Sequence, residues 1–175
     1  MKKIFPVLLL ILVMLTGCNS DTVSTPLYDG KNLIIGVIGN LPKVREGNVK
    51  FKKIIFNKIE ESKNLSSEFD AIFIKKEHLS EAANSKYANI YKHSGIPFFF
   101  IESKKSDIAF VDEPEQFSYE DAPDLGNPPP YAIGYPFGKG KNQYCAYEND
   151  KVNKNTIKDV YTRIFASIES GKCFK

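Results

Sequence analysis

Three short apolar segments, separated by stretches with helical periodicity, limit most strongly how this 175-residue chain can fold. Each is rich in Ile, Val or Phe and is bounded by polar residues or glycine, as expected of a strand buried on both faces. They lie at 33–38, 69–74 and 96–101. A strand that is buried on both faces needs helices above and below the sheet, so the pattern predicts an α/β fold.

The segments between and after these strands complete the expected order of elements. Apolar residues at helical spacing predict helices at 49–62, 79–91 and 157–168, the last of them ended by Gly171. A short fourth strand is expected at 108–111, and a hairpin at 131–137 and 143–148 around the turn 138–141. We therefore expect a small three-layer sheet with helices on its faces, its strands parallel where helices join them.

Two families of α/β fold suit this order, and we favour the thioredoxin-like one over a small doubly wound sheet. The segment 95–100 (Gly-Ile-Pro-Phe-Phe-Phe) resembles the thioredoxin element in which a cis-proline leads into a central strand. Asn40-Leu41-Pro42-Lys43 sits where that family carries its Cys-x-x-Cys. No cysteine lies between Cys18 and Cys145, which excludes thiol-disulfide exchange at that position.

The N-terminus has the layout of a secretion signal. Lys2 and Lys3 precede an uncharged apolar run from Ile4 to Leu15, too short to cross a bilayer of about 30 Å. The run ends in Leu15-Thr16-Gly17-Cys18, which resembles the lipobox of bacterial lipoproteins. That resemblance implies cleavage after Gly17 and attachment of acyl chains to Cys18, so that the mature protein is anchored to the outer face of the cell membrane.

The expected organisation is a signal peptide at 1–17, a lipidated Cys18 and flexible tether at 18–30, and one α/β domain at 31–175. Without Lys2 and Lys3 the chain holds 22 basic and 21 acidic residues, a net charge of +1. So balanced a composition gives no overall field that selects nucleic acid or an anionic surface. We interpret the many lysines as solvated surface and expect no nucleic-acid partner.

Cys145 and Cys173 are the thiols that remain once Cys18 is lipidated. An exported, oxidising compartment favours a disulfide between them, which would stabilise the fold by about 3–4 kcal/mol on the chain-entropy model. The alternative is two separate thiols, with Cys145 buried and Cys173 in a frayed tail.

Motifs of known chemistry are missing from the sequence. It contains no phosphate-binding loop, no Gly-x-Gly-x-x-Gly and no Gly-x-Ser-x-Gly. His78 and His93 stand 15 residues apart at opposite ends of one expected helix, too far apart to bind one metal ion together. We therefore expect no metal, no cofactor and no catalytic residues.

The segment 112–142 is the part of the domain where we expect a functional surface. It contains an irregular insertion around 112–130, dense in carboxylates, which we interpret as a solvated acidic loop in preference to a Ca²⁺ site. Its Asn127-Pro128-Pro129-Pro130 run reads as a rigid spacer more readily than as a docked polyproline ribbon. The proposed binding surface consists of the aromatic side chains Tyr119, Tyr131, Tyr135 and Phe137.

These observations favour a non-enzymatic binding or interaction domain, anchored at the cell membrane and facing an envelope protein partner. Two alternatives stay open. One is an extracytoplasmic hydrolase or redox-related enzyme, for which a pocket with convergent polar groups near Pro97 and Asn40 would be the support. The other is a surface exclusion or immunity lipoprotein.

Overall fold

The computed structural model describes residues 25–110, 117–137, 143–148 and 152–174. Its strands are β1 (Leu33–Ile38), β2 (Val49–Ile54), β3 (Ala71–Lys75), β4 (Phe98–Ile101), β5 (Ala132–Phe137) and β6 (Gln143–Tyr147). Its α-helices are α2 (Phe56–Glu61), α3 (Leu79–Ala82), α4 (Ser85–His93) and α5 (Lys154–Ser170). Short 3₁₀ helices occur at η2 (Leu65–Ser67), η3 (Lys76–His78) and η4 (Asp107–Phe110).

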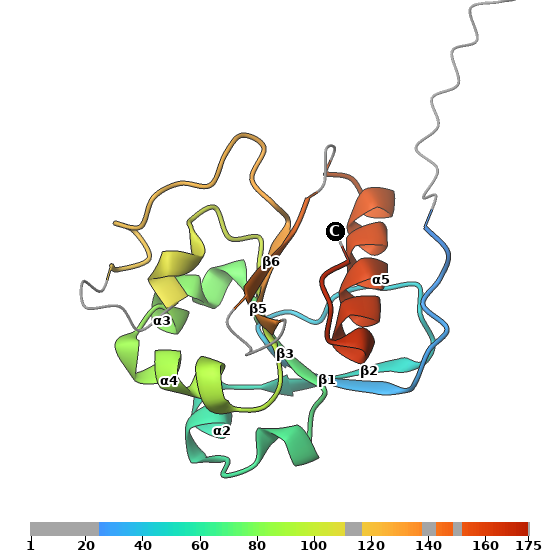
Figure 1. Cartoon of the computed structure of the whole chain (residues 1–175), viewed down its shortest axis with the longest axis horizontal. Helices are drawn as coiled ribbons and strands as arrows, with labels where there is room; N and C mark the ends of the chain where they lie inside the picture. Colours follow the sequence, from blue (N-terminus) through green and yellow to red (C-terminus); the bar gives the residue numbers. More distant parts are fainter. Residues whose placement is uncertain (1–24, 111–116, 138–142, 149–151, 175) are drawn as a thin grey trace, which may run out of the picture.

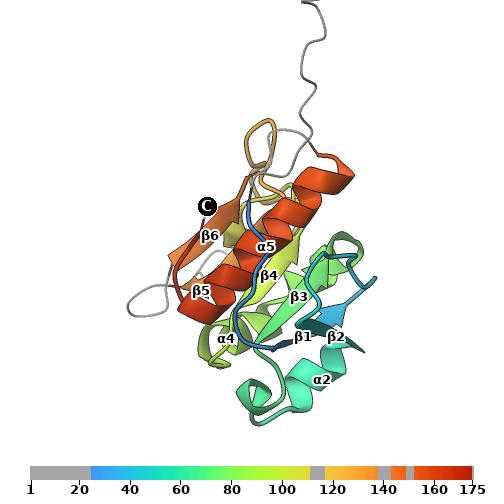
Figure 2. The ribbon, with the colours of Figure 1, turned by 90° about the vertical axis from the view of Figure 1, so that its right-hand side faces the viewer.

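The strands form one six-stranded sheet in the order β2-β1-β3-β4-β5-β6. The first four run parallel, whereas β5 and β6 are antiparallel to their neighbours. Helix α5 covers one face of this sheet, and α2, α3 and α4 cover the other (Figures 1 and 2). The expected α/β fold with a sheet between two helical layers is thus present.

Strand alternation divides the apolar side chains between two cores. In β4, Phe98 and Phe100 point into the core shared with α2, α3 and α4, while Phe99 and Ile101 point into the core under α5. All four are fully buried. This double burial explains why the sequence of β4 is continuously apolar and does not alternate with polar residues.

The preference for a thioredoxin-like fold is not confirmed. The order of the first five strands, 2-1-3-4-5, is that of a common doubly wound sheet, with the fifth strand reversed here. Asn40 follows β1 and Pro97 precedes β4, and these strands are parallel through β3. Asn40 and Pro97 therefore lie at opposite ends of the strands, and no single site contains both. The cis X–Pro bonds among the described residues precede Pro128 and Pro136, not Pro97.

The helix expected at 49–62 is wrong in its first half. Residues Val49–Ile54 form strand β2, paired in parallel with β1 at the edge of the sheet, and only Phe56–Glu61 is helical. The segment Val-Lys-Phe-Lys-Lys-Ile also fits an alternating strand pattern, in which Val49 and Phe51 share one face. Periodicity over six residues did not separate the two structures, and pairing with β1 decided it.

Two further expectations were incomplete. The helix at 79–91 is present as α3 and α4, divided at Ala83 and Asn84 because the Asn84 side chain accepts a hydrogen bond from the Lys86 backbone and begins a new helix. The short strand expected at 108–111 is wrong, since residues 107–110 form the 3₁₀ helix η4 and residue 111 lies outside the described residues.

The hairpin and the last helix agree with the sequence. Helix α5 begins with a capping box between Asn153 and Thr156 and ends at Gly171, whose φ of 66° lies in the left-handed region. Strands β5 and β6 form the expected antiparallel pair, while the turn at 138–141 lies outside the described residues.

Candidate functional site

Two prolines end the pairing between β4 and β5. Phe98 is paired with Tyr135, so the next positions outward on the two antiparallel strands are Pro97 and Pro136. Neither proline has a backbone N–H to donate, and the ladder does not continue past them. The pairing of β5 with β6 also changes register between Gly134 and Phe137. The sheet therefore opens at the amino end of β4.

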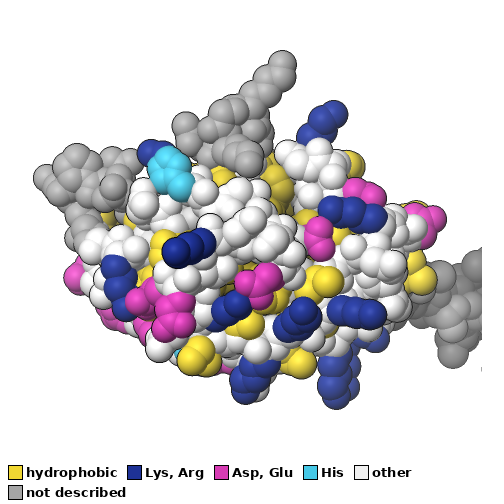
Figure 3. Space-filling model, turned by 90° about the horizontal axis from the view of Figure 1, so that it is seen from below, with side chains coloured by type: hydrophobic (Ala, Val, Ile, Leu, Met, Phe, Trp, Pro, Cys, Tyr) yellow, Lys and Arg dark blue, Asp and Glu magenta, His cyan; other side chains and the backbone are white. Residues whose placement is uncertain are grey.

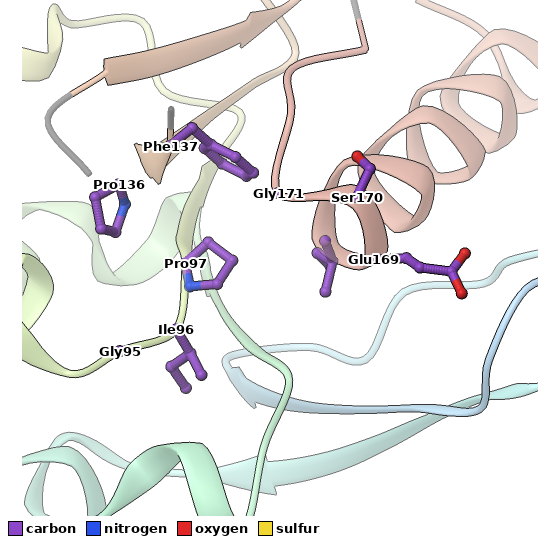
Figure 4. Close-up of a pocket in the computed structure, with 9 residues that line it drawn as sticks. Gly95, Ile96, Pro97, Pro136, Phe137, Glu169, Ser170 and Gly171 are labelled. Atoms are coloured by element: carbon purple, nitrogen blue, oxygen red, sulfur yellow. The ribbon is translucent and has the colours of Figure 1, made fainter. Parts of the chain in front are cut away.

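This opening forms the floor of a pocket of about 410 Å³, within the range of small-molecule sites. Its walls come from the turn before β4, the end of β5 and the end of α5 (Figure 4). The lining residues are Gly95, Ile96, Pro97, Pro136, Phe137, Ile168, Glu169, Ser170 and Gly171. The side chains from the turn before β4 and from β5 are apolar, while the end of α5 and the backbone give the lining nearly as much polar as apolar surface.

The charged group of this pocket faces away from its floor. Figure 4 shows the Glu169 side chain extending away from Pro97 and Phe137. One Glu169 carboxylate oxygen accepts a hydrogen bond of 3.1 Å from the Lys31 backbone N–H. Burial, followed by the neighbouring Glu169 carboxylate, raises the pKa of Tyr28 to about 12. Glu169 therefore holds the segment before β1 against α5, and the side chains that face the pocket floor are apolar.

A cluster of charged and hydroxyl side chains lies at the other end of the parallel strands. The ammonium group of Lys75, at the end of β3, lies 3.1 Å from a carboxylate oxygen of Glu102 and 3.4 Å from the Tyr161 hydroxyl. The Lys75 side chain is only 10% exposed, so it depends on these partners. Lys76 binds the second carboxylate oxygen of Glu102 at 2.9 Å.

The electrostatics of this cluster favour a charged Glu102 and neutral tyrosines. Burial by itself would raise the pKa of the Glu102 carboxyl, but Lys76 and Lys75 outweigh it and hold that pKa below its ordinary value. Burial, with a smaller contribution from Tyr131, raises the pKa of the Tyr161 hydroxyl far above its ordinary range. Burial thus favours the protonated form of the Tyr161 hydroxyl.

Backbone conformation at this end is unusual as well. Glu102 has a φ of 62°, in the left-handed region that non-glycine residues adopt at a cost of about 1–2 kcal/mol. Gly39, after β1, has a φ of 114°. Beside it, the Asn40 backbone N–H donates to the Glu77 carboxylate at 3.1 Å. Ligands of doubly wound sheets bind at this end of the strands, but here ion pairs and hydrogen bonds occupy it.

The four aromatic residues predicted as a binding surface do not form one exposed surface. Tyr131, Tyr135 and Phe137 are 7%, 6% and 3% exposed, because β5 is covered on both faces. Tyr131 and Phe137 belong to the core under α5, and Tyr135 belongs to the opposite core. Tyr119 packs on Phe110, and its hydroxyl accepts a hydrogen bond from the Lys104 backbone. Phe137 alone reaches the pocket.

The described part of the acidic insertion is attached to the segment that follows β4. Lys105 forms an ion pair of 3.0 Å with Asp124, and the Leu125 backbone N–H donates to the Lys104 carbonyl at 2.8 Å. The Glu120 carboxylate accepts a hydrogen bond from Ser80. These carboxylates thus have partners within the fold, while residues 111–116 lie outside the described part of the chain.

Cys145 and Cys173 form a disulfide in the structure, with Cα atoms 5.6 Å apart. Cys145 lies on β6 and is fully buried, and Cys173 follows Gly171 at the rim of the pocket. The bond fixes the chain after α5 to the sheet. Cys18 lies outside the described residues.

Comparisons with known proteins gave no match among protein-family models, curated proteins or solved structures. Within the described residues, no group of three or more His, Cys, Asp or Glu side chains is arranged to hold a metal ion. No helix in that same part of the chain is both long and apolar enough to cross a bilayer.

Sequence analysis named Pro97 as a place to look for a pocket, but only for the enzyme alternative and together with Asn40, which does not line it. It missed Pro136 and the end of α5, although a signal for the opening was present. Pro97 and Pro136 each interrupt an otherwise strand-like segment, which indicates that pairing ends there. Without the register of β4 against β5, nothing in the sequence shows that the two prolines face each other, or that the end of α5 adjoins them.

Proposed function

We propose that this protein is a membrane-anchored extracytoplasmic lipoprotein whose domain binds an apolar group of an envelope partner or small ligand in the pocket beside Pro97 and Pro136. The observation that carries the binding proposal is the pocket of about 410 Å³, in which five apolar side chains lie beside the polar end of α5. The sequence Leu-Thr-Gly-Cys at residues 15–18 supports the anchor.

The composition of the pocket suits contact with an apolar side chain or ring. Ile96, Pro97, Pro136, Phe137 and Ile168 bury apolar area without presenting buried hydrogen-bond donors that a ligand would have to satisfy. An apolar group that leaves water there gains about 25 cal/mol per Å² of buried surface. Such a site favours binding over acid–base chemistry, since the one carboxylate of its lining, Glu169, is turned outward.

Titration with N-acetylphenylalanine amide, followed by backbone NMR shifts, tests the pocket. We expect shifts at residues 95–97, 136–137 and 168–171, and their loss in Ile168→Trp, whose indole fills the cavity. Ile157→Trp is the matched control, because Ile157 is a partly buried isoleucine near the other end of α5. Shifts that persist in Ile168→Trp, or that map to another region, would refute pocket binding.

Intact mass spectrometry of the protein from isolated membranes tests the anchor. We expect the mass of residues 18–175 plus acyl chains, and release from the membrane fraction for Cys18→Ala. An unacylated protein in the soluble fraction would refute the lipoprotein proposal and leave the pocket to be judged by its own titration.

A further inference from the structure

The edge strand β2 concentrates positive charge that the overall composition hides. Residues 43–58 contain six Lys or Arg and one acidic residue, although the whole chain has a formal net charge of only +3. The acidic residue, Glu46, is 7% exposed and accepts a hydrogen bond from Thr162. Lys58 is paired with Glu68 at 2.7 Å, so the positive excess that remains lies mainly on the lysines of β2 itself.

Three lysines of this segment lie on the strand that ends the sheet. Lys50, Lys52 and Lys53 are exposed, and within the part of the chain that the structure describes none of them forms an ion pair. Figure 3 looks at the molecule from the side of α2 and β2 and shows Lys and Arg side chains spread over this face, with Asp and Glu side chains among them. Ile55, directly after β2, is 64% exposed.

The start of the described chain lies beside the same segment. Arg45, four residues before β2, donates a hydrogen bond of 3.4 Å to the Thr25 carbonyl. From Cys18 to Thr25 the chain can span at most about 25 Å, even when fully extended. A lipid on Cys18 would thus keep the basic segment close to the headgroups of its own membrane.

We propose that the β2 edge, through Lys50, Lys52 and Lys53, rests on the anionic headgroups of the membrane to which the protein is anchored. This inference rests on the proposed lipid anchor. Lysines near an anionic bilayer are attracted individually, and an exposed apolar residue beside them can enter the interface. Lysines on an edge strand also oppose addition of another strand, which favours a lipid surface over a strand-adding protein as the occupant.

Lysine footprinting of the lipidated protein tests this contact. The protein is reconstituted in vesicles of phosphatidylcholine alone or with about 30% phosphatidylglycerol, and acetylated by a water-soluble reagent. We expect at least about threefold less acetylation of Lys50, Lys52 and Lys53 in the anionic vesicles, reversed by 0.5 M NaCl. Lys92 and Lys172, exposed outside the β2 edge, are the internal controls and should not change.

A variant without these lysines tests whether they, and not another part of the protein, hold β2 against the membrane. In the wild-type protein we expect amide hydrogen exchange of β2 to be slower in anionic vesicles than in neutral ones. The triple variant Lys50→Gln/Lys52→Gln/Lys53→Gln should lose this difference. The control variant Lys92→Gln/Lys172→Gln should retain it. Equal labelling in both vesicle types would overturn the proposal. So would protection seen only in native membranes, which would indicate an acidic protein.

The anchor and the edge contact can fail separately. Should intact mass show no lipid, the unlipidated chain can be sedimented with the same vesicles. Binding that requires phosphatidylglycerol and these three lysines would then support the edge contact, although the lipid-anchor proposal would be refuted. Lipidation without the labelling difference would retain the anchor and refute the contact.

Discussion

The two ends of the parallel strands are built in opposite ways. At the carboxyl end, Lys75 is joined to Glu102 by an ion pair and to Tyr161 by a hydrogen bond, and the backbone at Glu102 is in a left-handed conformation. At the amino end, Pro97 and Pro136 stop the ladder and leave an apolar pocket. Ligands of such sheets usually bind at the carboxyl end, whereas this pocket lies at the amino end.

This contrast predicts that substitutions at the carboxyl end cost stability, whereas side chains lining the amino-end pocket can be changed at a smaller cost. The disulfide is the expected exception at the amino end, because it holds the chain after α5 next to the pocket.

Removing the disulfide should have the largest effect. We expect Cys145→Ser/Cys173→Ser to lower the free energy of unfolding by about 3–4 kcal/mol, because its 28-residue separation in sequence no longer restricts the unfolded chain. Urea unfolding of the oxidised protein and the variant measures the difference. Wild type under reducing conditions should match the variant, and a loss below about 1 kcal/mol would contradict the prediction.

Gly39→Ala should be the next most damaging change. A Cβ at this position would lie 2.7 Å from the Lys75 Cβ, and a φ of 114° is unfavourable for alanine. We expect a loss of about 2–3 kcal/mol in thermal or urea unfolding. Gly47→Ala is the control, since nothing lies within 4 Å of the added Cβ and it should leave stability almost unchanged.

Glu102→Gln should cost about 1–2 kcal/mol at neutral pH, a value reduced by the partial exposure of the carboxylate. The pKa of Glu102 is lowered in the folded protein, so its contribution is present above the unfolded pKa of about 4.3. It is lost as the pH falls through the lower folded value. Unfolding curves of wild type and variant should therefore converge in acid, and a gap that stays constant below pH 3 would argue against the ion pair.

Ile168→Ala should be the mildest change, at about 1 kcal/mol, because this side chain is only partly buried at the pocket wall. Ile164→Ala, one turn earlier and fully buried, should cost about 3 kcal/mol in the same unfolding assay. Equal losses at the two positions would mean that the amino end is packed as tightly as the core and would remove the contrast between the ends.

Local sequence signals determined much of the fold. Continuous apolar runs predicted β1, β3 and β4, because a strand buried on both faces cannot alternate with polar residues. The stripe of α5 and its end at Gly171 followed from spacing and the conformational freedom of glycine. The α/β class followed from the order of these elements.

Tertiary structure decided what depends on pairing between distant segments. Whether 49–54 is a strand or a helix was settled by pairing with β1, which turned a row of apparently solvated lysines into the basic edge of the sheet. The aromatic residues of β5 became core because helices cover both faces of the sheet. Pro97 and Pro136 meet only through the register of β4 with β5. Composition and periodicity depend on residues close together in the sequence, whereas a binding site is formed by residues that only the folded chain brings into contact.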